Sequence, residues 1–248
     1  MSVIKLGGSI LFKGDKLNRD VLSGWIEIIA SMLSKSKVAV VVGGGTVARM
    51  YIRWARDLGL SEFVCDLFGI GISRLNAMLI SNWARYRYPE INISTRIPST
   101  PQEVLDLINV HDLVFCGGFI PGQSTVGVAS EVAEAIGAKY LLIATDVDGI
   151  YDKDPKIYSD AKRIARIGLS ELLEKFKFSS QQAGSYKLFD IQSLKIMERA
   201  KITCIVFNGS DLSKSRKIVE LVLENKLEHI GDIGTIVVPS QDVLTRLY

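Results

Sequence analysis

One glycine-rich stretch, Val38 to Arg49 (VAVVVGGGTVAR), constrains the fold of this chain more than any other. Its first five residues are β-formers, too few for a helix and apolar on both faces. That pattern is typical of a strand buried in a parallel sheet between two layers of helices. Three glycines follow, and Thr46 then opens an amphipathic stretch that predicts a helix. A turn of this kind presents bare N–H groups to a phosphate, although the glycines also fit a tight turn that needs them only for its geometry.

Two further predicted strands end in the same way. Gly7-Gly8-Ser9 follows the apolar segment Val3 to Leu6, and Gly117-Gly118 follows Leu113 to Cys116. In open α/β sheets, ligands bind outside the carboxyl ends of the strands. Three glycine turns at one edge of a sheet therefore predict one long ligand with several phosphates, or two phosphorylated ligands.

The composition limits the classes of protein to consider. The 248 residues are 48% hydrophobic and 23% charged, which fits one large α/β domain or two lobes that share a sheet. The net charge is +3, and the basic residues are dispersed, so we expect no nucleic-acid partner. We also expect no membrane span, because no apolar run reaches the ~18–20 residues required. The chain enters a strand at once, which predicts no signal peptide.

The cysteines and histidines argue against metal and disulfide chemistry. Cys65, Cys116 and Cys204 are far apart and odd in number, which indicates reduced thiols in a cytoplasmic protein. His111 and His229 are isolated from each other and from the cysteines. A zinc site is therefore not expected.

The chain shows no long linker, internal repeat or low-complexity segment. We therefore predict a single α/β domain over residues 1–248. It would consist of an N-terminal lobe to about residue 138 and a C-terminal lobe from about residue 139. Asn18, Thr100 and Asp190 each precede a helical pattern and are predicted to cap a helix.

Two charged residues interrupt apolar segments. Lys5 is either an edge-strand lysine that faces solvent or a cation held beside a bound phosphate. Asp66 needs hydrogen-bond donors if it is buried. It either caps a helix that begins near Ile72 or accepts hydrogen bonds from ribose hydroxyls. The helix itself is rich in Leu and Ile, so we expect it to be largely buried and to line a lobe or subunit interface.

The segment Thr145 to Pro155 (TDVDGIYDKDP) holds four aspartates within nine residues. Its glycine and its last acid do not match the positions of a calcium-binding EF-hand loop. The segment is either a solvated turn with Asp side-chain caps or part of a nucleotide site in which Tyr151 flanks a base.

Together these segments resemble the amino acid kinase superfamily, and within it the archaeal uridylate (UMP) kinases. The resemblance extends over nearly the whole chain, and its motifs occur in the expected order: KLGGS, GGGTVAR, CDLFGIGISRLNAML, GGFIPGQST, TDVDGIYDKDP and QAGSYKLFDIQSLKI. It implies a three-layer αβα sandwich with a mainly parallel central sheet, the carbamate kinase-like fold of this superfamily.

The resemblance also implies an activity. It is that of a cytoplasmic kinase of pyrimidine nucleotide biosynthesis that transfers the γ-phosphoryl group of ATP to UMP with Mg²⁺. UMP would bind in the N-terminal lobe and ATP in the C-terminal lobe. The family commonly forms homohexamers. Phosphoryl transfer needs alignment and charge neutralisation rather than a covalent nucleophile, which agrees with the lack of a His or Cys motif.

Site residues follow from the same resemblance. Lys5 and Lys195 match charge-neutralising lysines and are the predicted catalytic residues. The residues implied for ATP are Gly8, Ser9, Gly45, Arg49, Thr145, Asp146, Tyr151 and Asp154. Those implied for UMP are Gly44, Asp66, Phe119, Ile120, Pro121, Gly122, Gln123, Ser124 and Thr125. No protein ligand for a metal is predicted. The chain departs from the pattern at Val126, where many relatives carry an aspartate.

Other functions stay open at this point. GGGTVA also fits the dinucleotide fingerprint G-x-G-x-x-A, with Glu62 at a suitable distance, but the other glycine turns have no place in an NAD-dependent oxidoreductase. A kinase of the same fold acting on isopentenyl phosphate or carbamate is a second alternative, and a non-catalytic nucleotide- or anion-binding protein is a third. The G-x-x-x-x-G-K-[ST] motif of P-loop kinases is absent.

Overall fold

The computed structural model describes residues 1–240 apart from 15, 154, 156 and 180–187, and of 175–179 only the backbone. Within these residues, a seven-stranded sheet has the order β5-β4-β1-β6-β10-β11-β9. The neighbouring strands are parallel, apart from the antiparallel pair β10 and β11. The strands are β1 (Ser2–Leu6), β4 (Val38–Val42), β5 (Leu113–Cys116), β6 (Tyr140–Thr145), β9 (Arg166–Gly168), β10 (Thr203–Asn208) and β11 (Thr235–Val238).

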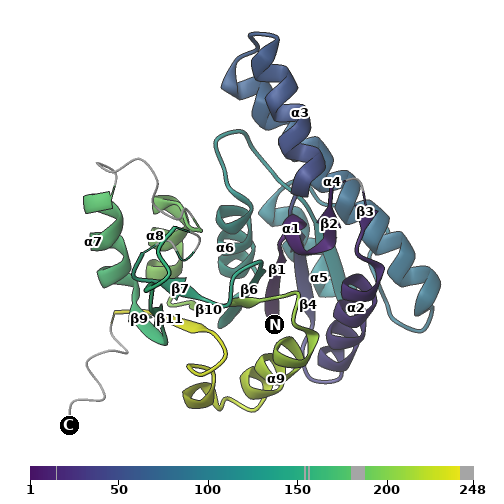
Figure 1. The fold of residues 1–248 in the computed structure, drawn as a ribbon. Coiled ribbons are helices and arrows are strands. Elements are labelled where there is room, and N and C mark those ends of the chain that lie inside the picture. The colour runs from purple at the N-terminus through teal and green to yellow at the C-terminus, as the bar shows by residue number, and fades with distance from the viewer. Residues whose placement is uncertain (15, 154, 156, 180–187, 241–248) are drawn as a thin grey trace.

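Helices cover both faces of this sheet (Figure 1). One layer contains α2 (Arg19–Leu33), α9 (Leu212–Leu223) and the C-terminal half of α4 (Glu62–Arg87). The other contains α5 (Pro101–Val110), α6 (Thr125–Ala135), α7 (Leu169–Ser179) and α8 (Ile191–Arg199). Two separate hydrophobic cores result, one on each side of the sheet.

Shorter elements complete the chain. They are α1 (Gly8–Leu11), the hairpin β2 (Phe12–Lys13) and β3 (Lys16–Leu17), the pair β7 (Ile150–Tyr151) and β8 (Arg163–Ile164), and η1 (Leu227–His229). Helix α3 (Gly45–Asp57) and the first half of α4 pack against each other and project from the body at the carboxyl ends of the strands (Figure 1).

The central strands are buried as predicted. All five residues of β4 are buried, and so are all five of β1, which lies between β4 and β6. Side chains alternate along a strand, so Ile4 and Leu6 enter one core while Val3 enters the other. Lys5 is on the same face as Val3. The hypothesis of an edge-strand lysine is therefore wrong, because β1 is a central strand.

The three predicted helix caps are confirmed. The side chains of Asn18, Thr100 and Asp190 each accept a hydrogen bond from the backbone N–H three residues ahead. Such caps satisfy a donor that the helix itself leaves unpaired.

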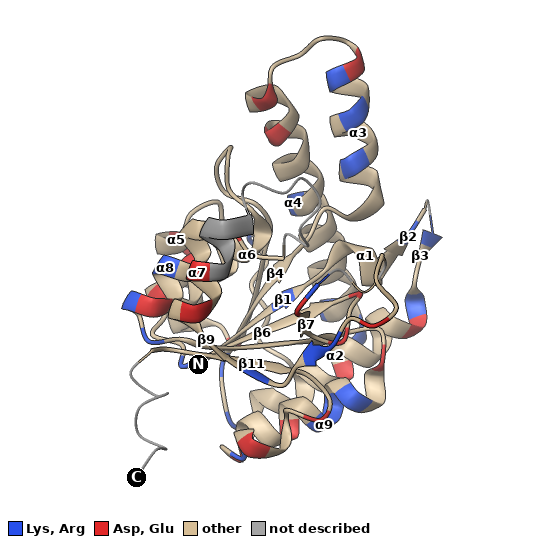
Figure 2. Cartoon of the chain, turned by 60° about the vertical axis from the view of Figure 1, so that its left-hand side comes forward, with Lys and Arg blue, Asp and Glu red and all other residues tan. Residues whose placement is uncertain are grey.

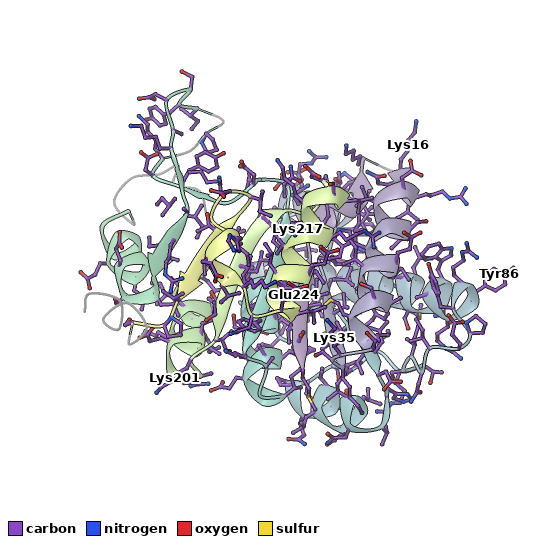
Figure 3. The ribbon with its side chains drawn as sticks, turned by 90° about the horizontal axis from the view of Figure 1, so that it is seen from below. Lys16, Lys35, Tyr86, Lys201, Lys217 and Glu224 are labelled. Atoms are coloured by element: carbon purple, nitrogen blue, oxygen red, sulfur yellow. The ribbon has the colours of Figure 1, made fainter. Side chains whose placement is uncertain are left out.

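Helix α4 differs from its prediction in two ways. It begins at Glu62 rather than near Ile72, since the two glycines within it, at about 1 kcal/mol each, do not outweigh its packing against α3. It is also not largely buried: apolar side chains along its length are between 38 and 60% exposed, namely Phe63, Leu67, Phe68, Leu75, Met78 and Leu79. Tyr86 near its C-terminal end points outward (Figure 3).

The sequence predicted no membrane span, and one helix meets the criteria for a span by length and composition only. Helix α4 has 26 residues and a hydropathy of 1.5, which by length and composition alone suffice to cross a membrane. This is weak evidence for a span, because helices of water-soluble proteins pass the same test. Polar side chains of α4 also bind turns of the sheet, as described next.

Candidate active site at the carboxyl ends of the strands

The first two glycine turns lie at the same edge of the sheet, as predicted, and they pack backbone to backbone. A Cβ atom added to Gly8 would lie 2.2 Å from the nitrogen of Gly45, and one added to Gly43 would lie 2.8 Å from the nitrogen of Gly8. Gly45 also has a φ of 67°, which side chains rarely adopt. The two hypotheses for the triple glycine are therefore compatible. The turn needs glycine for its geometry, and helix α3 begins there with N–H groups that suit an anion.

Lys5 lies directly beneath these turns. A Cβ on Gly7 would lie 3.4 Å from its Nζ atom, and the side chain is only 8% exposed. Burial lowers the pKa of the Lys5 ammonium to about 8, and the charge of Asp146 partly offsets this shift. The site therefore contains a buried cation that gains stability from any anion bound above it.

Helix α4 holds the triple-glycine turn in place through Asn76. Its Nδ2 atom donates to the carbonyl oxygens of Gly43 and Gly44, at 3.0 and 3.2 Å. These bonds fix the two peptide planes that precede helix α3. In the sequence, the only signal for this role of Asn76 is a polar residue within an apolar helix.

The third glycine turn is held by the same helix. Arg74 donates from Nε to the carbonyl of Gly118 and from Nη2 to that of Phe119, at 2.8 and 3.1 Å. Ser73 Oγ accepts the N–H of Gly118 at 2.7 Å. A Cβ on Gly117 would lie 2.5 Å from the nitrogen of Arg74, so glycine is required for this close approach. One turn of α4 therefore positions two of the three glycine turns.

A hollow of about 260 Å³ lies between α3, α4 and the third turn. It is lined by Gly44, Gly45, Ala48, Arg49, Ile52, Asp66, Gly69, Ile70, Ser73, Gly118, Ile120, Gln123 and Thr125. Five of the residues predicted for UMP are thus brought together, and Gly45 and Arg49, predicted for ATP, line the same hollow. Arg49 is exposed and begins a row of arginines along α3 (Figure 2). Arg56, in the last turn, is paired with Glu62.

Asp66 is inside α4, so the hypothesis that it caps a helix is wrong. Its Oδ2 atom accepts the N–H of Gly122 at 2.7 Å. Its Oδ1 atom makes no hydrogen bond within the part of the chain that the structure describes. A carboxylate with one committed oxygen and one open oxygen at the edge of the hollow can accept a hydrogen bond from a ligand hydroxyl.

The loop that follows the third glycine turn, residues 119–125, is called the acceptor loop because the resemblance implies UMP as its ligand. Its residues differ in exposure. Phe119 is buried, whereas Ile120 is 57% exposed. Pro121 lies between Ile120 and Gly122, and Gly122 has a φ of 79°. The side-chain amide of Gln123 is buried without a hydrogen-bond partner among the described residues. Such a group is costly to leave unpaired.

The loop ends at helix α6, where Ser124 is the N-cap and accepts the N–H of Gly127. Thr125 is the first residue of the helix. Val126, the position at which many relatives carry an aspartate, is buried in the core of this protein.

The acidic segment, residues 145–155, makes side-chain contacts with residues of the C-terminal half of the chain. Thr145 is buried at the end of β6, and its Oγ1 donates to Asp146 at 3.2 Å. The hydroxyl of Tyr151 donates to Asp148 at 2.6 Å, and this bond raises the pKa of Tyr151. Arg163 lies 3.7 Å from Asp148.

Asp154, which the resemblance implies for ATP, lies outside the described residues. Among the described residues, no group of three His, Cys, Asp or Glu side chains is arranged to hold a metal ion.

The structure separates Lys195 from the other predicted site residues. Leu194 and Met197 turn into the core, so Lys195 faces outward from α8. It lines a different hollow, together with Glu131, Ile191, Gln192, Ile196 and Arg199. Lys5 lies at the glycine turns, and Lys195 does not.

The arrangement supplies anion binding rather than a nucleophile. Backbone N–H groups, Lys5 and Arg49 provide positive charge. The one thiol near the third turn, Cys116, is inert because burial raises its pKa to about 12. Binding, alignment and charge neutralisation are what phosphoryl transfer requires.

Comparisons with known proteins agree with this geometry. A uridylate kinase from Sulfurisphaera tokodaii is 41% identical over 205 residues, which are 82% of this chain and 84% of that protein. One from Methanothermobacter thermautotrophicus is 35% identical and covers 96% of this chain and 98% of its own length.

Solved structures show the same fold. The crystal structure of uridylate kinase from Archaeoglobus fulgidus has a TM-score of 0.75 at 32% identity and covers 95% of this chain and 99% of its own. A UMP kinase from Bacillus anthracis has a TM-score of 0.76 at 18% identity, covering 96% of both chains. The predicted three-layer sandwich with a mainly parallel sheet is thereby confirmed. The model of the amino acid kinase family matches residues 1–208, and this chain belongs to that family.

Proposed function

We propose that this protein is a UMP kinase, which transfers the γ-phosphoryl group of ATP to UMP and releases UDP and ADP in pyrimidine nucleotide biosynthesis. One observation carries the proposal: the hollow that unites Gly44, Arg49 and Asp66 opens beside the glycine turns above Lys5. Relatives named uridylate kinase that align with 82 to 96% of the chain support the choice of acceptor.

UMP would occupy the hollow in the N-terminal lobe, residues 1 to about 138. Its phosphate would meet the N–H groups at the start of α3 and the guanidinium of Arg49. The open oxygen of Asp66 would accept a hydrogen bond from a ribose hydroxyl. The acceptor loop, residues 119–125, would enclose the uracil and the phosphate.

ATP would bind to the C-terminal lobe, residues from about 139 to 248. Thr145, Asp146, Tyr151 and Asp154 are proposed for its adenosine, and Gly8 and Ser9 for its phosphates. Mg²⁺ would keep several of its waters and would be held chiefly by the substrate phosphates. When bound, Mg²⁺ would neutralise charge on the β- and γ-phosphates.

Lys5 is proposed as the catalytic cation. The attacking group of UMP is already a phosphate anion, so the reaction needs no general base. A buried ammonium beside the glycine turns stabilises negative charge more strongly than an exposed one. Lys195 would act only if α8 moved, because it lines a separate hollow.

We also propose a cytoplasmic homohexamer. The exposed apolar side chains of α4 are a surface that assembly would cover, and the three free buried cysteines agree with a reducing compartment. Light scattering on the purified protein tests the assembly, and a monomer at micromolar concentration would contradict it.

Turnover of a panel of acceptors tests the function. Purified protein is incubated with Mg-ATP and UMP, CMP, dUMP, carbamate or isopentenyl phosphate, and products are separated by ion-exchange chromatography. We expect UDP as the main product. Turnover of carbamate or isopentenyl phosphate without UDP would assign another acceptor, and nucleotide binding without turnover of any acceptor would indicate a non-catalytic member.

A further inference from the structure

One carboxylate joins the N-terminal ends of two helices that are far apart in the sequence. Asp190 Oδ1 accepts the N–H of Ser193 at 2.7 Å and so caps α8. Its other oxygen, Oδ2, accepts the hydroxyl of Ser124. Ser124 in turn accepts the N–H of Gly127 at 2.9 Å and caps α6. A helix cap uses only one carboxylate oxygen, so the bond from Ser124 to the second oxygen of Asp190 is an additional interaction.

The packing around this contact is tight. A Cβ on Gly127 would lie 3.2 Å from Asp190 Oδ2 and 3.1 Å from Cγ of Gln123. Any larger residue would therefore press on the carboxylate. A methyl group at position 127 would require Gln123 or Asp190 to shift by a few tenths of an ångström.

The contact falls on the acceptor loop. Arg74 holds the start of this loop through the carbonyls of Gly118 and Phe119, and Asp66 holds its middle through the N–H of Gly122. Where the loop ends, the hydroxyl of Ser124 donates to Asp190, in addition to accepting the N–H of Gly127. The first two anchors come from α4, whereas the third comes from α8.

We propose that Asp190 is a positioning residue for the acceptor, which fixes the end of the loop to α8 through Ser124. This inference rests on the proposed function and adds to it a determinant of acceptor affinity outside the hollow. Without the Asp190–Ser124 contact, the end of the loop is held only by the bond from the N–H of Gly127 to Ser124. Ordering this end then uses part of the binding free energy of UMP, so the affinity for UMP falls while the chemistry at Lys5 is unchanged. A hydrogen bond to a charged group supports a change of about 10-fold.

The variant Asp190→Ser separates this role from capping. Serine is a good N-cap, but its side chain is too short to cap α8 and reach Ser124 together. Asp211→Ser is the matched control, because Asp211 caps α9 by accepting the N–H of Lys214 on the opposite face of the sheet. We expect Asp190→Ser to raise the KM for UMP about 10-fold with kcat and the KM for ATP unchanged, and Asp211→Ser to change none of them.

A double-mutant cycle with Ser124→Ala gives the second test. If the two side chains act as one unit, Asp190→Ser changes the KM of the Ser124→Ala protein by less than about twofold. The proposal would be overturned if the effects of the two substitutions on the KM for UMP multiplied. It would also be overturned if Asp190→Ser, like Asp211→Ser, left the KM for UMP unchanged. If Asp190→Ser does not fold, Asp190→Asn, which keeps a capping oxygen and removes the charge, must still raise the KM for UMP.

Hydrogen exchange gives a readout that does not depend on activity. The amide of Gly127 should exchange faster in Asp190→Ser than in Asp211→Ser or the wild type. A wild type that makes no UDP would refute the proposed function, and equal exchange at Gly127 in all three proteins would refute the positioning role.

Discussion

Replacing Lys5 with methionine tests the buried cation most directly. The substitution keeps the length of the side chain and removes its charge from a central strand. Burial lowers the Lys5 pKa from 10.5 to about 8. At 1.36 kcal/mol per pKa unit, the charged form costs about 3 kcal/mol in the folded protein. We therefore expect Lys5→Met to raise the free energy of unfolding at pH 7 by up to about 3 kcal/mol and to lower kcat about 10²–10³-fold.

The stability gain should depend on pH. The folded pKa is below the unfolded one, so between about pH 8 and 10.5 the unfolded wild-type chain binds the proton that the folded chain has lost. Wild-type stability therefore rises with pH across this window, relative to the variant. The difference between the two proteins should be largest at pH 7 and small at pH 10.5. In the free enzyme, kcat/KM should fall above about pH 8, as Lys5 loses its charge.

Urea denaturation at both pH values measures the effect at constant ionic strength. The control is Lys16→Met, since Lys16 is an exposed lysine in a hairpin (Figure 3), and its effect should stay within about 0.5 kcal/mol. A Lys5→Met protein that is less stable than the wild type at pH 7, or whose gain does not change with pH, would refute the argument from burial. If the Lys5→Met protein keeps the kcat of the wild type, Lys5 has no role in catalysis.

Three further substitutions test other parts of the site. Asp66→Asn should reduce the preference for UMP over dUMP, measured as the ratio of kcat/KM, and an unchanged ratio would remove Asp66 from ribose recognition. Gly44→Ala should raise the KM for UMP while the circular dichroism spectrum stays the same; its Cβ would lie 2.5 Å from that of Ala48 and displace the start of α3, and unchanged kinetics would leave the turn a structural role only. Lys195→Ala should change kcat less than about twofold, because Lys195 faces outward and lines a separate hollow, whereas a loss of about 10²–10³-fold, typical of a catalytic donor, would show that α8 moves during turnover.

Local patterns in the sequence determined a large part of this protein. The buried strands, the glycine turns that follow them and the caps at Asn18, Thr100 and Asp190 were all predictable. Each depends on interactions between residues at most a few positions apart, or on the alternation of apolar residues along one element. The order of the motifs was also sufficient to indicate the amino acid kinase family.

The tertiary structure decided how the charged residues are used. Lys5 is buried because the sheet order places β1 between β4 and β6, and no local pattern reveals that order. Asp66 belongs to a helix that begins earlier than its glycines indicated, and Lys195 faces outward because its neighbours turn into the core. The contact of Ser124 with Asp190 spans 66 positions and exists only because α6 and α8 pack side by side. Such contacts depend on how whole helices and strands pack together. The packing of distant segments is determined by the apolar surface that all of them bury in the two cores, and neither segment determines it alone.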